Sequence, residues 1–324
     1  MADVTVLLTG AAGFIGMHTA TRLLERGDAV VGIDNLNDYY DVALKEARLA
    51  RLQKYANFRF VRGDIADPAA LAEAGRDCDR IIHLAAQAGV RYSLINPSAY
   101  IQTNLVGHFN VLELGRAMGD RLKMLVYASS SSVYGGNTKL PFSVDDPVDR
   151  PVSLYAATKK SDELMSYSYS HIFGLPQTGL RFFTVYGPWG RPDMAAYIFI
   201  SKIMAGEPIP VFNHGDMQRD FTFVDDIVTG VVASLDRKVD PAERHKVYNI
   251  GNHQSEPLMR FIGVIEQALG KKAEIDFQPI QPGDVQATYA DIEATRRDLG
   301  FEPTTPIDVG IPRFVEWYRD YHGV

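Results

Sequence analysis

Short apolar runs alternate with amphipathic stretches along the first half of the chain, which predicts a parallel sheet flanked by helices. Residues 4–9 form a continuous apolar run, as expected of a strand buried on both faces. The predicted strands are 4–9, 29–33, 58–61, 80–84, 124–128 and 178–183. The predicted helices are 13–26, 41–55, one that begins at Asp67-Pro68, 96–118 and 155–173.

The second half is less regular, with predicted loops at 186–193, 213–220 and 278–284. Apolar patterns at 223–235 and 247–251 indicate segments that return to the first domain. We therefore predict an α/β protein with a doubly wound parallel sheet over residues 1–183. A smaller, mixed α/β substrate domain is expected over 184–324. Because no linker rich in Pro, Gly or Ser separates them, the two parts are expected to enclose a ligand cleft.

The composition is that of a soluble globular protein, with 46% hydrophobic and 23% charged residues among 324. Lys and Arg number 33 against 40 Asp and Glu, and the net charge of −7 argues against binding to nucleic acid or anionic membranes. No apolar run approaches the ~18 residues of a membrane span, and no targeting segment is recognised. The lone cysteine, Cys78, suits the reducing cytoplasm, where we expect the protein.

Three glycines, Gly10, Gly13 and Gly16, lie between the first predicted strand and the first helix. They allow a tight turn, close approach of the backbone to a pyrophosphate, and close packing of the helix on the strand. Asp34 follows the second strand, 18 residues beyond Gly16. An acidic side chain there binds both ribose hydroxyls and repels a 2′-phosphate. The loop therefore predicts a Rossmann site for NAD rather than NADP.

A tyrosine and a lysine, Tyr155 and Lys159, lie four residues apart at the start of a predicted helix and so share one face. The nearby ammonium favours the phenolate form of the tyrosine, which can then take a proton from a sugar hydroxyl. The pattern Tyr-x-x-x-Lys is common by itself. Here it follows a strand that ends in the serine run 129–132.

Together these motifs resemble the extended branch of the short-chain dehydrogenase/reductase family, and within it the nucleotide-sugar 4-epimerases. The resemblance covers essentially the whole chain and implies a catalytic triad of Ser130, Tyr155 and Lys159. It also implies NAD contacts from a larger set of residues, namely Gly10, Gly13, Phe14, Ile15, Gly16, Asp34, Asn35, Asn37, Asp64, Ile65, Leu84, Ala85, Ala86, Asn104, Tyr155 and Lys159.

By this resemblance, Tyr155 removes the proton of the sugar C4 hydroxyl while NAD takes the C4 hydride, and the hydride returns to the other face of a 4-keto sugar. Ser130 would hydrogen-bond the reacting oxygen, and Lys159 would hold the nicotinamide ribose. The family also pairs two helices of each subunit across a dimer interface. Here those helices would be 97–118 and 155–173, so a homodimer is expected.

The second-half motifs look most like those of the UDP-glucuronate 4-epimerases. Residues 181–194 match the version of the sugar-bordering loop found in that group. Arg191 is expected to pair with the C6 carboxylate, because a guanidinium binds a carboxylate through two hydrogen bonds. Thr184 would add a further hydrogen bond. Ser130 and Ser131 are also expected at the substrate.

The UDP moiety is expected to meet two further residues of the second half. Arg219 matches an arginine that approaches the pyrophosphate, and residues 281–284, which include Asp284, resemble the uridine-ribose loop. Many sugar epimerases have arginine where this chain has Gln281, so contacts at that position stay open.

Other functions stay open beside UDP-glucuronate 4-epimerisation. A 4-keto glucuronate is a β-keto acid that can lose carbon dioxide, so a UDP-glucuronate decarboxylase is one alternative. Family decarboxylases and 4,6-dehydratases, however, carry acidic residues where this chain has Ser131 and Ser132. A UDP-galactose 4-epimerase would leave Arg191 without a carboxylate. The non-enzyme alternative is an NAD-binding regulator, and the presence of Tyr155 and Lys159 argues against it. No metal is expected, since the eight histidines show no ligand spacing.

Overall fold

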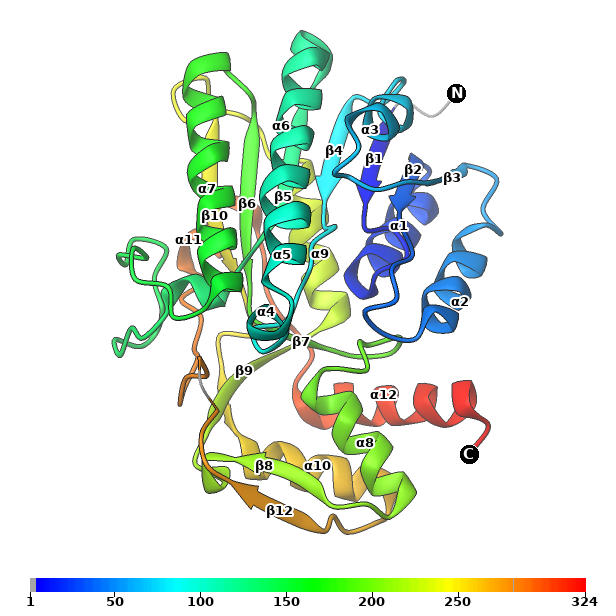
Figure 1. The fold of residues 1–324 in the computed structure, drawn as a ribbon, viewed down its shortest axis with the longest axis vertical. Coiled ribbons are helices and arrows are strands. Elements are labelled where there is room, and N and C mark those ends of the chain that lie inside the picture. The colour runs from blue at the N-terminus through cyan, green and yellow to red at the C-terminus, as the bar shows by residue number, and fades with distance from the viewer. Residues whose placement is uncertain (1–3, 282) are drawn as a thin grey trace.

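The computed structural model of the protein describes residues 4–281 and 283–324. Seven parallel strands form one sheet in the order β10-β6-β5-β4-β1-β2-β3, with helices on both faces (Figure 1). This doubly wound arrangement confirms the predicted α/β fold class. The strands of the sheet are β1 (Thr5–Thr9), β2 (Ala29–Asp34), β3 (Phe58–Arg62), β4 (Arg80–His83), β5 (Met124–Ser130), β6 (Gln177–Phe182) and β10 (His245–Ile250).

The apolar runs form the strands because both faces of the sheet are covered. In β1, Val6 and Leu8 belong to one buried cluster and Leu7 belongs to a second cluster on the opposite face. The predicted strand ends differ by one or two residues from the observed ones. The consequential difference is in β5, which continues to Ser130 and so carries the predicted catalytic serine as its last residue.

Most first-half helices begin and end within one residue of the prediction, but the predicted helix 41–55 ends three residues earlier in the structure, and the short helix at Tyr92–Ile95 was not predicted. Gly27 ends α1 (Phe14–Arg26) with φ +100°, and the Asp67 side chain caps α3 (Pro68–Ala74). The predicted helix 96–118 is divided into α5 (Pro97–Tyr100), a π-helical turn (Ile101–Val106) and α6 (Gly107–Met118). Turns of this kind are frequent at functional sites. The neighbouring helices are α2 (Val42–Leu52), α4 (Tyr92–Ile95) and α7 (Leu154–Phe173).

The helices cover the sheet in two layers (Figure 1). Helices α3, α6 and α7 pack on one face, and α1 packs with α9 (Val224–Leu235) on the other. Strand β10 comes from the second half and pairs with β6 at the edge of the sheet. Both returning segments therefore lie near their predicted residues. The boundary between 183 and 184 stays a prediction.

The rest of the second half forms a lobe beyond the carboxyl ends of the strands (Figure 1). The predicted loop 213–220 is partly wrong, because β9 already begins at Gln218. An aromatic core holds the lobe together, as in the stacking of Phe221 of β9 on Phe261 of α10 at 3.8 Å between ring centroids. The lobe contains β7 (Thr184–Tyr186), α8 (Ala195–Ala205), β8 (Ile209–Phe212), β9 (Gln218–Phe223), β11 (Ser255–Pro257), α10 (Leu258–Leu269), β12 (Ile275–Gln278) and α12 (Ile307–His322). Helix α11 (Glu293–Leu299) instead packs beside β10 and α9 of the sheet domain (Figure 1).

No helix within residues 4–281 and 283–324 has the length and apolar character needed to cross a membrane.

Candidate active site

A cavity of about 430 Å³ lies at the carboxyl ends of the parallel strands, where open α/β sheets bind their ligands. Residues of both halves of the chain line it. Twenty predicted site residues are among them: Gly10, Gly13, Phe14, Ile15, Gly16, Asp34, Asn35, Asn37, Ile65, Leu84, Ala85, Ala86, Ser130, Ser131, Tyr155, Lys159, Thr184, Arg191, Arg219 and Asp284. Asp64 and Asn104 do not line the cavity.

The glycine loop leaves no room for side chains on its inner side. Gly10 has φ +74°, a conformation that favours glycine. A Cβ atom on Gly16 would lie 2.0 Å from the Gly10 carbonyl oxygen, and one on Gly13 would lie 2.9 Å from the same atom. The loop therefore brings its backbone and the N-terminus of α1 directly to the cavity. This arrangement fits a dinucleotide pyrophosphate.

Asp34 is held at the end of β2 by backbone donors. Its Oδ2 accepts a hydrogen bond from the Ala12 N–H at 3.1 Å, and its Oδ1 accepts one from Leu36 at 2.9 Å. Burial raises the pKa of this carboxyl, and the backbone donor at Leu36 acts against the rise. The fixed position of Asp34 on the cavity wall suits recognition of ribose hydroxyls.

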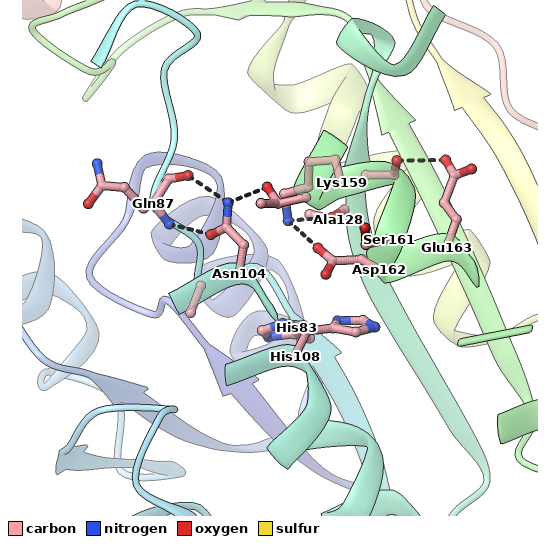
Figure 2. Close-up of polar contacts among 12 residues, drawn as sticks. His83, Gln87, Asn104, His108, Ala128, Lys159, Ser161, Asp162 and Glu163 are labelled. Carbon is pink, nitrogen blue, oxygen red and sulfur yellow. Dashed lines mark hydrogen bonds and ion pairs between the residues drawn. The ribbon is translucent and has the colours of Figure 1, made fainter. Parts of the chain in front are cut away.

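The two predicted residues outside the cavity lining have structural partners. Asp64 accepts hydrogen bonds from Asn35 Nδ2 at 2.9 Å and from the Ala66 N–H at 2.8 Å, so its carboxylate orients the cavity residue Asn35, and its own contact with the cofactor stays a prediction. Asn104, in the π-helical turn, exchanges hydrogen bonds with the Gln87 backbone and donates to Thr158 Oγ1 at 3.0 Å (Figure 2). It thereby fixes the loop after β4 against α7.

The predicted acid–base residues come together between β5 and α7. Ser153 caps α7 by accepting a hydrogen bond from the Ala156 N–H, which places Tyr155 in the first helical turn. Lys159 follows one turn later, and its Nζ donates to the Ala128 carbonyl at 3.0 Å and to Asp162 Oδ2 at 3.1 Å (Figure 2). Ser130, Tyr155 and Lys159 all line the same cavity.

A buried ion pair that the sequence analysis missed supports this wall of the cavity. Arg181 on β6 binds both oxygens of Glu163, at 2.8 and 2.9 Å, and Glu163 also accepts from Ser129 at 2.7 Å. Burial alone would raise the pKa of Glu163, but the Arg181 guanidinium outweighs it and holds this pKa below its ordinary value. The pair fixes α7 against β6, and the bond from Ser129 ties the same helix to β5, the strand that carries Ser130.

Arg191 already has a carboxylate partner in this structure. Its Nε donates to Asp193 Oδ1 at 3.0 Å, its second nitrogen donates to Asp193 Oδ2, and Tyr39 donates to the same carboxylate at 3.0 Å. The fully buried Arg48, on α2, holds the loop by donating to the carbonyls of Trp189 and Gly190. Arg48 was also missed. Its spacing of four residues from Leu44 and Leu52 places it on the apolar face of α2, which could have signalled its burial but not its partners.

The predicted UDP residues meet each other across the cavity. Arg219 donates to Asp284 Oδ1 at 2.7 Å, while its other terminal nitrogen donates to the carbonyls of Gln218 and Gln286. In the predicted loop 281–284, Pro282 lies outside the described residues. Within the described ranges, no group of three or more His, Cys, Asp or Glu side chains is placed to hold a metal ion.

Residues 6–251 match the NAD dependent epimerase/dehydratase family. The chain belongs to this family. It is 47% identical to a probable UDP-glucuronate 4-epimerase of Rhizobium meliloti, with 96% of each chain covered. It is also 47% identical to UDP-glucuronate 4-epimerase 4 of Arabidopsis thaliana, over 98% of this chain and 76% of that one. The structure resembles UDP-glucuronic acid 4-epimerase from Bacillus cereus, solved with UDP-glucuronic acid and NAD, with a TM-score of 0.91, 34% identity, and coverage of 98% and 100%.

The role of the glycine loop in NAD binding can be tested by adding one methyl group at Gly16. Gly16→Ala is expected to abolish measurable NAD binding and to lower the free energy of unfolding by roughly 1–3 kcal/mol, because the added Cβ would collide with the Gly10 carbonyl. Gly263→Ala is the matched control, since no atom lies within 4 Å of a Cβ on that α10 residue. It should leave NAD binding unchanged and stabilise the fold by up to about 1 kcal/mol. Calorimetric titration with NAD and urea unfolding measure both effects. Equal NAD affinity in the two variants would contradict the assignment of the loop.

Proposed function

We propose that this protein interconverts UDP-glucuronate and UDP-galacturonate by NAD-dependent epimerisation at the sugar C4. The observation that carries the proposal is the convergence of Ser130, Tyr155, Lys159 and Arg191 on one cavity beside the glycine loop. Relatives that are named UDP-glucuronate 4-epimerases and match nearly the whole chain support it.

Tyr155 is the general base and general acid of the reaction. Its phenolate takes the proton of the C4 hydroxyl, and its phenol returns a proton after the sugar has turned. The Lys159 ammonium, one helical turn away, favours the phenolate. Ser130, at the end of β5, hydrogen-bonds the C4 oxygen. Such positioned proton transfer contributes ~10²–10⁴ in rate. The glycine loop and Asp34 would hold NAD, which would supply a reversible acceptor for the C4 hydride.

The arginine in the sugar loop distinguishes this proposal from a neutral-sugar epimerase. The 4-keto form of glucuronate loses carbon dioxide when the bond to its carboxylate aligns with the carbonyl π system. A bidentate guanidinium holds a carboxylate in one position and so limits the tilt of the bond that joins it to C5. We assign this task to Arg191, with Thr184 on the same cavity wall adding a hydrogen bond. Arg219 would meet the UDP pyrophosphate, and Asp284 would meet the uridine ribose.

The first test is proton NMR of the purified protein incubated with UDP-glucuronate or, in parallel, UDP-glucose. Conversion of UDP-glucuronate into UDP-galacturonate is expected. Tyr155→Phe should lower this turnover at least ~100-fold while NAD stays bound, because only the proton-transferring hydroxyl is lost. UDP-xylose and carbon dioxide from the unmodified protein, or conversion of UDP-glucose alone, would contradict the proposal. Near-normal turnover by Tyr155→Phe would contradict the role of the tyrosine.

A second prediction concerns the carboxylate. Arg191→Gln is expected to raise KM for UDP-glucuronate roughly tenfold or more, the effect of losing a charged hydrogen bond. It should also release detectable UDP-xylose, because the bond between C5 and the carboxylate can then move into alignment with the carbonyl π system. Both are measured by NMR time courses against Arg22→Gln, a control at an exposed α1 position. Unchanged KM and the absence of UDP-xylose would exclude Arg191 as the carboxylate ligand.

We also propose that the protein is a homodimer through α5–α6 and α7. On α7, the side chains of Leu164, Tyr167 and Ile172 are 59–64% exposed, and Ile101 and Phe109 add apolar area on the neighbouring element. Light scattering should give a mass of twice the 36.0 kDa of one chain. The Leu164→Glu variant should give the mass of a single chain, because the substitution places a charge in the apolar face. A single-chain mass for the unmodified protein would contradict the proposal.

A further inference from the structure

One ion pair inside the structure lies directly against the acid–base residues. Lys159 donates to Asp162 Oδ2 at 3.1 Å, and both side chains are nearly inaccessible, with 3% and 0% of their surface exposed. Both lie on the inner face of α7, where Lys159 also donates to the Ala128 carbonyl (Figure 2). The ammonium is thus held by one carbonyl of the catalytic strand and one carboxylate of its own helix.

Among the described residues around Asp162, no other charged side chain is available to pair with Asp162 in place of Lys159. From the neighbouring elements, His83 on β4, His108 on α6 and Tyr127 on β5 face this region, and Figure 2 shows the two imidazoles next to the pair. Burial lowers the pKa of His83 to about 3 and that of His108 well below its ordinary value, and it raises the pKa of Tyr127. All three are therefore neutral near pH 7.

The remaining charged neighbour, Glu163, is itself paired with Arg181. Asp162 Oδ1 has no hydrogen-bond partner among the described residues. A carboxylate that is fully buried with one oxygen unpaired costs stability, and Lys159 is its compensating charge. Burial raises the pKa of Asp162 to about 7, while Lys159 acts against the rise. The charge on Asp162 is therefore present above neutral pH and lost as the pH falls through that value.

We propose that Asp162 is a positioning residue of the acid–base step, which acts as the counter-ion of Lys159 and sets how much positive charge Tyr155 experiences. This inference rests on the roles proposed above for Tyr155 and Lys159. It adds that a carboxylate on α7, which does not line the cavity, weakens the electrostatic effect of the Lys159 ammonium on Tyr155.

The direction of the effect follows from electrostatics. Removing a negative charge makes every nearby group release its proton at lower pH, whether the group is a phenol or an ammonium. Without the Asp162 charge, Tyr155 therefore becomes a phenolate more readily, and Lys159 loses its proton more readily. Since the wild-type carboxyl is itself neutral at low pH, the difference should appear above about pH 7 and vanish well below it.

The test is Asp162→Asn, which keeps the shape and removes the charge. The midpoint of tyrosinate absorbance at Tyr155, isolated as the difference from the same protein carrying Tyr155→Phe, should fall by roughly one pH unit with NAD bound. The limb of the kcat/KM profile on which activity rises with pH should move to lower pH by a similar amount, because it reports the ionisation of the base, and the two profiles should coincide below about pH 6. Lys160→Gln is the matched control: Lys160 has the same i,i+3 geometry to Glu163 at 3.2 Å, but it is partly exposed. It should shift neither measurement.

The absorbance measurement needs no sugar, so it decides the inference even when the proposed substrate is wrong. A protein without turnover of UDP-glucuronate overturns the proposed function alone. An unchanged tyrosinate midpoint in Asp162→Asn, or an equal shift in Lys160→Gln, overturns the inference alone. If Asp162→Asn fails to fold, Asp162→Ser removes the same charge in a smaller side chain and carries the same expected shift. Lower activity at every pH without a displaced midpoint would assign Asp162 a structural role only and would also overturn the inference.

Discussion

The common direction of the seven strands is the constraint on which the site depends. Parallel strands bring their carboxyl ends to one edge of a sheet. Segments that are far apart in the chain therefore meet there: the glycine loop follows β1, Asp34 ends β2, and Ser130 ends β5. Since both faces of the sheet are buried under helices, the strands cannot slide or turn without exposing apolar side chains. The site residues at the strand ends are therefore held in fixed positions around the cavity.

Buried cations are the second organising feature. Arg181 and Lys159 face carboxylates, and Arg48 faces backbone carbonyls, each in surroundings closed to water. A buried ion without a partner costs several kcal/mol, so each arrangement permits only the geometry in which the partners meet. Arg181 fixes β6 against α7, and the partners of Lys159 hold its ammonium one helical turn from Tyr155. Arg48 fixes the sugar-bordering loop against the glycine loop, since it also donates to the Ala12 carbonyl. Each one restrains a different wall of the same cavity.

The parts of this architecture that depend on local sequence could be predicted, and those that depend on distant partners could not. The strands follow from their apolar runs, and the glycine loop follows from the positions of its glycines, of which Gly16 has no room for a Cβ atom. Arg48 could not be assigned, because the Trp189 and Gly190 carbonyls that it binds lie more than 140 residues away. For Asp64 the structure adds partners that the sequence does not reveal, Asn35 and the Ala66 N–H, and the cofactor role implied by the resemblance stays a prediction. The same limit applies to Asp162, since an i,i+3 pair in sequence does not reveal that both partners are buried.

The pairing of Arg191 with Asp193 bears on how a carboxylate substrate would be held. Asp193 occupies two of the five N–H donors of Arg191, so a substrate carboxylate would bind the donors that remain. Asp193 and Tyr39 keep the planar guanidinium fixed before substrate arrives. For a 4-keto glucuronate, the outcome depends on whether the bond from C5 to the carboxylate carbon aligns with the carbonyl π system. An arginine that is oriented in advance and holds the carboxylate in one place therefore suits an epimerase better than a mobile one.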